Sequence, residues 1–100
     1  MSNISISTPF NKKFTHADYT VGLTATNLVN SMAPGTGRRI VTLIQNKSAT
    51  ATITLILNDT GTVGITLQPA TLFSIDNYSG TIRVAASAAS TPVHIAFSIV

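Results

Sequence analysis

The stretch RRIVTLIQNKSATATITLILND, residues 38–59, decides the fold because it holds two runs of Ile, Leu, Val and Thr separated by turn-forming residues. β-branched residues lose rotamer freedom in a helix and fit a pleated surface, so both runs are predicted to be strands. Residues 46–49, Asn-Lys-Ser-Ala, lie between the runs and suit a tight turn. We therefore predict a β-hairpin at the centre of the fold.

The second run alternates between apolar and hydroxyl side chains as far as Leu55. Ile53, Leu55 and Leu57 fall on one side of the predicted strand, and Thr52 and Thr54 fall on the other. This period of two is typical of a strand with one buried face and one wet face. Leu55 is accordingly a predicted core residue.

The first run, residues 40–44, is apolar on both faces apart from Thr42. A strand of this kind belongs in the middle of a sheet or at an interface between subunits.

The rest of the chain repeats the pattern of short strands separated by turns. Pro34, Gly35 and Gly37 mark a loop at residues 33–37, because these residues do not fit a central strand. Turn signals recur about every 8–12 residues, as in sandwiches and barrels. The other predicted strands are residues 4–6, 19–25, 63–67, 72–75, 82–84 and 93–99. We predict one domain over residues 1–100, an all-β antiparallel sandwich of about eight strands and of jelly-roll type, with residues 1–17 as an N-terminal strand or an arm.

The composition favours a protein that packs against neighbours. Hydrophobic residues make up 44% of the 100 residues and charged residues 9%, and there is no Glu. A disordered chain shows the opposite balance. Ser and Thr hydroxyls can face either water or a partner protein at little desolvation cost. An oligomer or an assembly component is therefore the favoured class.

The basic residues do not form the dense stripe that nucleic acid requires. Six Lys and Arg against three Asp give a net charge of +3, and four of the six fall in the doublets Lys12-Lys13 and Arg38-Arg39. Nucleic-acid binding usually needs a more continuous basic surface. Arg38 and Arg39 could be a solvated strand end, or their guanidinium groups could bind carboxylates of a partner protein. All four doublet residues are candidate partner contacts.

Catalytic chemistry has little support in this sequence. His16 and Asp18 would share one face of a strand, but the chain has no Cys or Glu to complete a zinc site. His94 falls on the polar face of the last predicted strand. The G-x-S-x-G element and the Gly-rich phosphate loops are absent. We predict no enzyme activity, no cofactor and no metal site.

No apolar run approaches the roughly 20 residues of a membrane span, and the N-terminus lacks the basic start and apolar segment of a signal peptide. We expect synthesis in a cytoplasm and no membrane partner.

The second half of the chain resembles small accessory virion proteins of tailed bacteriophages. In those proteins an arginine-led strand ending in Q-N-x-S precedes an L-x-P-G turn, an aromatic-Gly turn and a closing strand. The corresponding parts here are residues 38–48, Leu67-Gln68-Pro69, residues 76–82 and Val93-His94-Ile95. The similarity covers roughly the last sixty residues, and it departs from the pattern at Ala70, where the family prefers Gly. The first 37 residues carry no part of it.

The resemblance implies a capsid decoration or cement protein, usually a trimeric β-sandwich bound to the outside of the phage head. Its partners would be further copies of itself and the major capsid protein or another virion protein. Head fibres and tail components share the same pattern of turns and strands. The alternative from another class is a small β-module that binds glycan or nucleic acid, such as an adsorption domain or an OB-like domain, which would require exposed aromatic rings for stacking.

Overall fold

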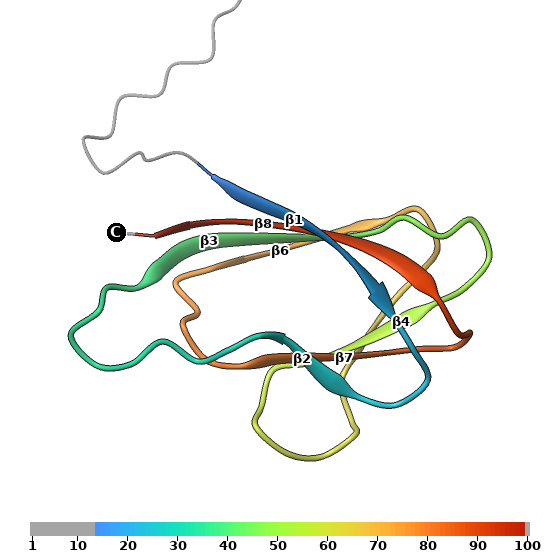
Figure 1. The fold of residues 1–100 in the computed structure, drawn as a ribbon, viewed down its shortest axis with the longest axis horizontal. Helices are drawn as coiled ribbons and strands as arrows, with labels where there is room; N and C mark the ends of the chain where they lie inside the picture. Colours follow the sequence, from blue (N-terminus) through green and yellow to red (C-terminus); the bar gives the residue numbers. More distant parts are fainter. Residues whose placement is uncertain (1–13, 100) are drawn as a thin grey trace, which may run out of the picture.

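The computed structural model describes residues 14–99, which form eight strands and no helix (Figure 1). The strands are β1 Thr15–Val21, β2 Thr26–Val29, β3 Arg39–Asn46, β4 Ile53–Ile56, β5 Ile65–Leu67, β6 Leu72–Asp76, β7 Ile82–Ala86 and β8 Thr91–Ile99. Sheet A has the order β1-β8-β3-β6 and sheet B the order β2-β7-β4-β5, with every pair antiparallel. Within residues 14–99 there is no helix long and apolar enough to cross a membrane.

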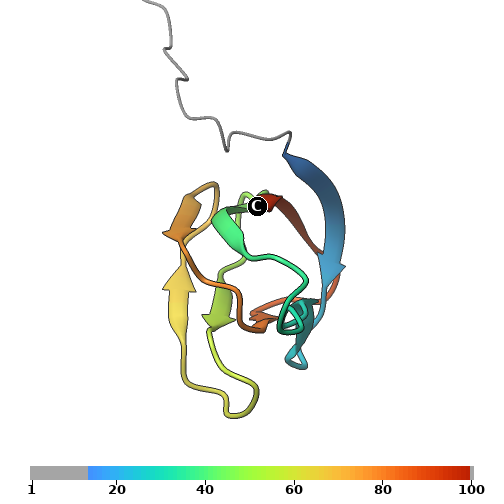
Figure 2. The ribbon, with the colours of Figure 1, turned by 90° about the vertical axis from the view of Figure 1, so that its left-hand side faces the viewer.

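This strand order is that of a jelly roll, so the predicted antiparallel sandwich of eight short strands is confirmed. The chain crosses from one sheet to the other at nearly every connection, and β4 and β5 are the consecutive strands that pair directly. In Figure 2, β5 and β6 lie at one side of the sandwich and β1 at the opposite side. The first strand, β1, forms an edge of sheet A and pairs there with the last strand, β8.

The predicted hairpin of residues 38–59 is wrong. β3 pairs with β8 and β6 in sheet A, whereas β4 pairs with β7 and β5 in sheet B. The turn residues that follow β3 do not fold the chain back along the same sheet. They carry it across to the other sheet, because the side chain of Asn46 holds the crossing segment by hydrogen bonds to its backbone.

Two predicted segments have other boundaries in the structure. Residues 19–25, predicted as one strand, contain the end of β1 at Val21 and a bend before β2 begins at Thr26. Residues 15–17, assigned to a possible arm, belong to β1 and pair with residues 95–97 of β8. The predicted strand at residues 4–6 and the doublet Lys12-Lys13 lie outside the described residues. The loop at 33–37 is confirmed, with positive φ at Gly35 and Gly37.

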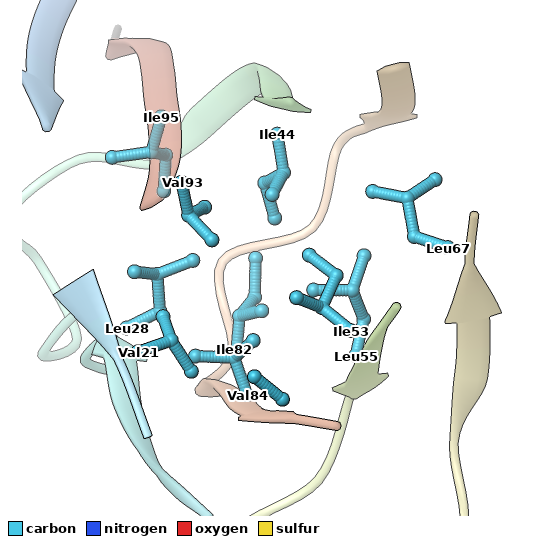
Figure 3. Packing of buried hydrophobic residues seen from close by; sticks show 11 residues of the cluster. Val21, Leu28, Ile44, Ile53, Leu55, Leu67, Ile82, Val84, Val93 and Ile95 are labelled. Carbon is cyan, nitrogen blue, oxygen red and sulfur yellow. The ribbon is translucent and has the colours of Figure 1, made fainter. Parts of the chain in front are cut away.

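The core lies between the two sheets and is built from branched aliphatic side chains (Figure 3). Leu55 of β4 is fully buried while Thr54, on the other side of the same strand, is half-buried, so the predicted alternation is confirmed. Burial of each such large apolar side chain stabilises the fold by about 1.5–3 kcal/mol. The core residues that are at most 1% exposed are Ile44, Ile53, Leu55, Ile82, Val84, Val93 and Ile95.

The loop after β4 covers the apolar side chain on the outer side of sheet B. Ile56 of β4 points away from the main core according to the alternation of the strand, yet it is only 2% exposed. The loop after β4 lies over it: Arg83 Nη1 donates a hydrogen bond to the Gly61 carbonyl at 2.6 Å. Gly64 packs directly against the Leu55 carbonyl, where a Cβ has no room. The apolar side chain on this face is therefore already covered by the chain itself.

Arg39 fixes the start of β3. It is 2% exposed, and its guanidinium donates to the carbonyls of Asn30 at 3.0 Å, Tyr78 at 3.2 Å and Gly80. Its backbone N–H donates to Ser79 Oγ at 3.0 Å. Burial lowers the pKa of Arg39, but a guanidinium stays charged in proteins. Arg39 therefore joins the end of the β2 segment and the β6–β7 turn to β3.

Asn46 fixes the other end of β3. This fully buried side chain donates from Nδ2 to the carbonyls of Ala51 at 2.8 Å and of Leu67 and Gln68 at 3.2 Å. Its Oδ1 accepts a hydrogen bond from the Ser48 N–H at 3.0 Å. One amide thus connects β3, the crossing to β4 and the turn between β5 and β6. We refer to the Arg39 and Asn46 networks as the two polar clasps of β3.

The two neighbouring arginines should differ sharply in their effect on stability. Arg39→Ala leaves three carbonyls without their donor, so we expect the free energy of unfolding to fall by about 2–4 kcal/mol in urea melts. Arg38→Ala is the matched control: Arg38 is exposed, and its loss should change stability by less than about 0.5 kcal/mol. Equal losses for the two variants would contradict the assigned role of Arg39.

The turn between β5 and β6 contains a residue with a strained backbone. Ala70 has a φ of 60°, a left-handed conformation that costs a residue with a Cβ about 1–2 kcal/mol. Ala70→Gly removes this strain. It also gives the unfolded chain more conformational entropy, which opposes the gain by about 0.4–1 kcal/mol. The net expectation is a stabilisation of about 0.5–1 kcal/mol by urea denaturation. In the nearby turn, Ala49→Gly relieves no positive φ and should destabilise instead.

Candidate functional site

The outer face of sheet A exposes apolar side chains of its central strand. β3 lies between β8 and β6, which confirms that the run apolar on both faces is in the middle of a sheet. A β-bulge between Arg39 and Val41 shifts the alternation by one residue, so that Arg39 points inward and Val41 points outward. Val41 and Leu43 are half-buried on this face although no other layer of the described residues packs on it.

Neighbouring strands extend this surface. Leu43 is opposite Ala96 of β8 and Ser74 of β6. Leu72, which is 60% exposed, is opposite Gln45. We call this surface the A face: Phe14, His16 and Asp18 beside and on β1, Val41, Leu43 and Gln45 on β3, Leu72, Ser74 and Asp76 on β6, and His94, Ala96 and Ser98 on β8.

The outer face of sheet B differs in kind. Thr54 of β4 is flanked by Thr66 of β5 and Ala85 of β7. Its apolar residue, Ile56, is covered by the loop that Arg83 holds. The strand residues of the two outer faces are therefore unequal: the apolar residue of the sheet B face is covered by a loop, whereas those of the A face are not, although Val63 in the covering loop is itself 91% exposed.

One end of the A face carries a connected polar cluster. His94 Nδ1 and Asp18 Oδ1 are 2.7 Å apart, and His94 Nε2 and His16 Nδ1 are 2.9 Å apart. Lys47 Nζ lies 3.7 Å from the same Asp18 oxygen. The antiparallel register of β1 and β8 causes this meeting, because it sets Asp18 opposite His94.

The electrostatics of the cluster fix where its protons lie. The hydrogen bond from His94, followed by the charge of Lys47, lowers the pKa of Asp18 below its ordinary value. An ionised carboxylate can only accept hydrogen bonds, so His94 Nδ1 must carry the proton that Asp18 receives. His94 Nε2 then faces His16 Nδ1.

The four candidate contacts predicted from the sequence have different places in the structure. Arg38 is exposed just before β3. Arg39 is buried in its clasp, so its guanidinium is bound to this chain's own carbonyls and is not available at the surface. Lys12 and Lys13 lie outside the described residues.

The sequence placed His16, Asp18 and His94 on polar strand faces but did not bring them together, since His16 and His94 are 78 positions apart. The jelly-roll pairing of the first and last strands is the signal that would have joined them.

The described residues form a surface and not a cleft. No pocket is found in them, and they contain no cluster of three or more His, Cys, Asp or Glu placed to hold a metal ion. Phe14 and Tyr19 are exposed rings, but they fall on opposite sides of β1, while Phe73, Tyr78 and Phe97 pack against the core. The described rings therefore do not make a continuous stacking platform.

Comparisons with known proteins bear on the fold. No protein-family model and no curated protein matched this sequence. A solved structure from the Bacillus endospore appendages, which form a family of disulfide-linked pili, is similar to this chain with a TM-score of 0.61 and 16% sequence identity. The likeness covers 98% of this chain and 96% of that chain. At this level of identity it shows a shared fold.

The Asp18 interactions should make part of the stability depend on pH. Because the folded-state pKa lies below the ordinary value of 3.8, the ionised carboxylate stabilises the fold above that value. This contribution is lost as the pH falls through the lowered pKa. Asp18→Asn should therefore reduce the urea midpoint at pH 7 and make little difference in stronger acid, near pH 2.

Asp76→Asn is the control on the same face, because Asp76 makes no ion pair with the described residues. A loss at pH 7 as large as that of Asp18→Asn would show that the cluster is not the cause.

Proposed function

We propose that this chain is a structural subunit that packs into a larger protein assembly through the A face. The observation that carries the proposal is the inequality of the two outer faces. Ile56 on sheet B is covered by the chain's own loop, whereas Val41, Leu43 and Leu72 on sheet A have no cover among the described residues. Contiguous exposed apolar surface on a soluble domain commonly marks an interaction site.

A protein partner suits this face better than a nucleic acid or a glycan. The positive side chains of the described residues are scattered: Arg38 precedes β3, Arg83 is on sheet B, and Lys47 is engaged by Asp18. Nucleic-acid binding draws on many phosphate contacts made together. A binding module of that class would also need exposed rings in one plane, and Phe14 and Tyr19 do not share a face. The module remains the alternative that the experiment below can reveal.

The assembly that we propose is a tailed-phage virion, with the chain as a decoration or cement protein on the outside of the head. Support comes from the resemblance in residues 38–48, 67–69 and 76–82, and from the jelly roll, which is a fold of many capsid proteins. The proposed partners are further copies of the chain, as a trimer, and a capsid or other virion protein. Arg38, Lys12 and Lys13 are the proposed polar contacts.

The similar Bacillus appendage protein also belongs to an assembly, a disulfide-linked pilus. This chain contains no cysteine, so its own assembly would be held by noncovalent contacts. Burial of the A face would contribute less than about 1.5–3 kcal/mol per large apolar side chain to such contacts, because Val41 and Leu43 are already half-buried. A subunit that binds only the assembled lattice stabilises that state, as any ligand stabilises the state it prefers, and many copies add their effects. No chemical step is needed for this function.

A charge placed on the A face should disrupt assembly. Leu43→Asp puts a carboxylate in the centre of the apolar surface, and Leu72→Asp puts one on the exposed edge strand. We expect either change to convert the isolated protein to monomers in sedimentation experiments at micromolar concentration and to prevent its binding to phage heads.

Thr54→Asp, at the centre of the outer face of sheet B, is the matched control and should leave both properties unchanged. The proposal is wrong if Leu72→Asp, once shown to be folded, assembles and binds heads as the unaltered protein does. Binding of the unaltered protein to DNA or glycan in place of heads would favour the alternative module.

A further inference from the structure

The two histidines of this chain meet at one point of its surface. The sequence contains two His in 100 residues, and they lie on adjacent strands with His16 Nδ1 and His94 Nε2 2.9 Å apart. The rings are tilted by 33° with their centroids 5.2 Å apart. His16 is exposed, and 29% of the His94 side chain is exposed to solvent. Ions in solution therefore have access to both rings.

We propose that His16 and His94 form a surface site for a divalent first-row transition-metal ion such as Zn²⁺. His16 Nδ1 and His94 Nε2 are the two protein ligands, and water completes the coordination. The inference does not depend on the proposed function.

The two nitrogens are close enough to share one ion once the exposed ring turns. Two imidazole nitrogens bound at about 2.0–2.1 Å to one ion lie about 2.9 Å apart when the angle at the metal is near 90°, and about 3.3 Å apart at the tetrahedral angle. The observed separation is 2.9 Å, and the ring centroids are 5.2 Å apart, so the two nitrogens face each other directly along their hydrogen bond. An ion bound by both lies off that line, so the exposed His16 ring turns to receive it while His94 keeps its contact with Asp18.

Asp18 prepares His94 to be a ligand. Metal-binding histidines almost always donate their second ring N–H to a carboxylate, carbonyl or water, which fixes the tautomer and the orientation of the ring. His94 Nδ1 makes this contact to Asp18 Oδ1 at 2.7 Å. The His94 Nε2 lone pair is then available on the side where His16 lies. The pair therefore has the supporting contact of a metal site in addition to a suitable spacing.

Binding requires a tautomer change in His16 and no other chemistry. When both rings are neutral, His16 Nδ1 carries the proton of the hydrogen bond to His94 Nε2. On binding, this proton leaves Nδ1 and the His16 Nε2 takes one up from water, so the neutral pair releases no net proton. A pair that carries one additional proton releases it.

The charges and ligand types around the pair define the ion. Imidazole suits Cu²⁺, Ni²⁺ and Zn²⁺, while Ca²⁺ and Mg²⁺ prefer oxygen ligands. Asp18 contributes a negative charge, and Lys47 Nζ, 3.7 Å from the Asp18 oxygen, contributes a positive one. With two protein ligands the site is weaker than a structural site with four. Lys47 therefore weakens cation binding and Asp18 strengthens it.

The experiment is a titration of the full chain, without an affinity tag, with ZnCl₂ and separately with MgCl₂ at pH 7.5. Binding is followed by calorimetry and by the NMR signals of the two histidine rings. We expect both rings to shift together with saturable Zn²⁺ binding, and no response to Mg²⁺. His16→Gln and His94→Gln should each weaken Zn²⁺ binding at least tenfold.

Variants next to the pair test its geometry. Asp18→Asn should weaken Zn²⁺ binding by about 10–100-fold through the loss of the carboxylate support, and Lys47→Gln should strengthen it a few-fold. Gln45→Ala, beside His94 on β3, is the control and should bind as the unaltered protein does. NMR spectra of each variant verify that it is folded. Zn²⁺ binding of equal strength in folded His94→Gln, or no ring shift at millimolar Zn²⁺, would overturn the proposal.

Discussion

The sandwich depends on β3 being held at both ends by buried polar side chains. Arg39 at its start and Asn46 at its end donate six side-chain hydrogen bonds to backbone carbonyls of segments that belong to other strands and turns. A buried polar group costs free energy unless it is paired, so each clasp is favourable only when all its segments are in place. The clasps therefore specify the jelly roll as well as stabilise it, because a different path of the chain would leave these groups without partners.

The clasps also give a physical reason for the sequence pattern on which the proposed resemblance to phage accessory proteins rests. Arg39, and Asn46 in the Q-N-x-S element, are the donors of the two clasps. The turns at residues 67–70 and 78–80 supply acceptors, and Ala70 has a left-handed backbone with a φ of 60°. These residues are the ones that the fold requires at the two ends of β3.

Strand positions could be predicted from the sequence because alternation is local, as at Ile53, Thr54 and Leu55. The pairing partners of the strands could not be predicted from the sequence, because the turn residues after β3 fit either a hairpin or a crossing between sheets. The choice depends on Asn46, whose acceptors lie up to 22 residues away.

The candidate site could be predicted from the sequence only in part, because its geometry also depends on which strands pair. Arg38 and Arg39 are adjacent and chemically identical, and the β-bulge between Arg39 and Val41, which follows from strand pairing, turns Arg39 toward the interior. The His16–His94 contact likewise requires the pairing of the two terminal strands.

The central claim is that the A face is covered in the assembled protein and the outer face of sheet B is not. Because the chain has no cysteine, a single Ser74→Cys or Thr66→Cys variant carries one thiol, on the A face and on the outer face of sheet B respectively, both at exposed positions. The measurement is the rate of maleimide labelling in the free and in the assembled protein. The account predicts that assembly strongly slows labelling at position 74 and leaves position 66 reactive, and undiminished labelling at position 74 in the assembled protein would contradict it.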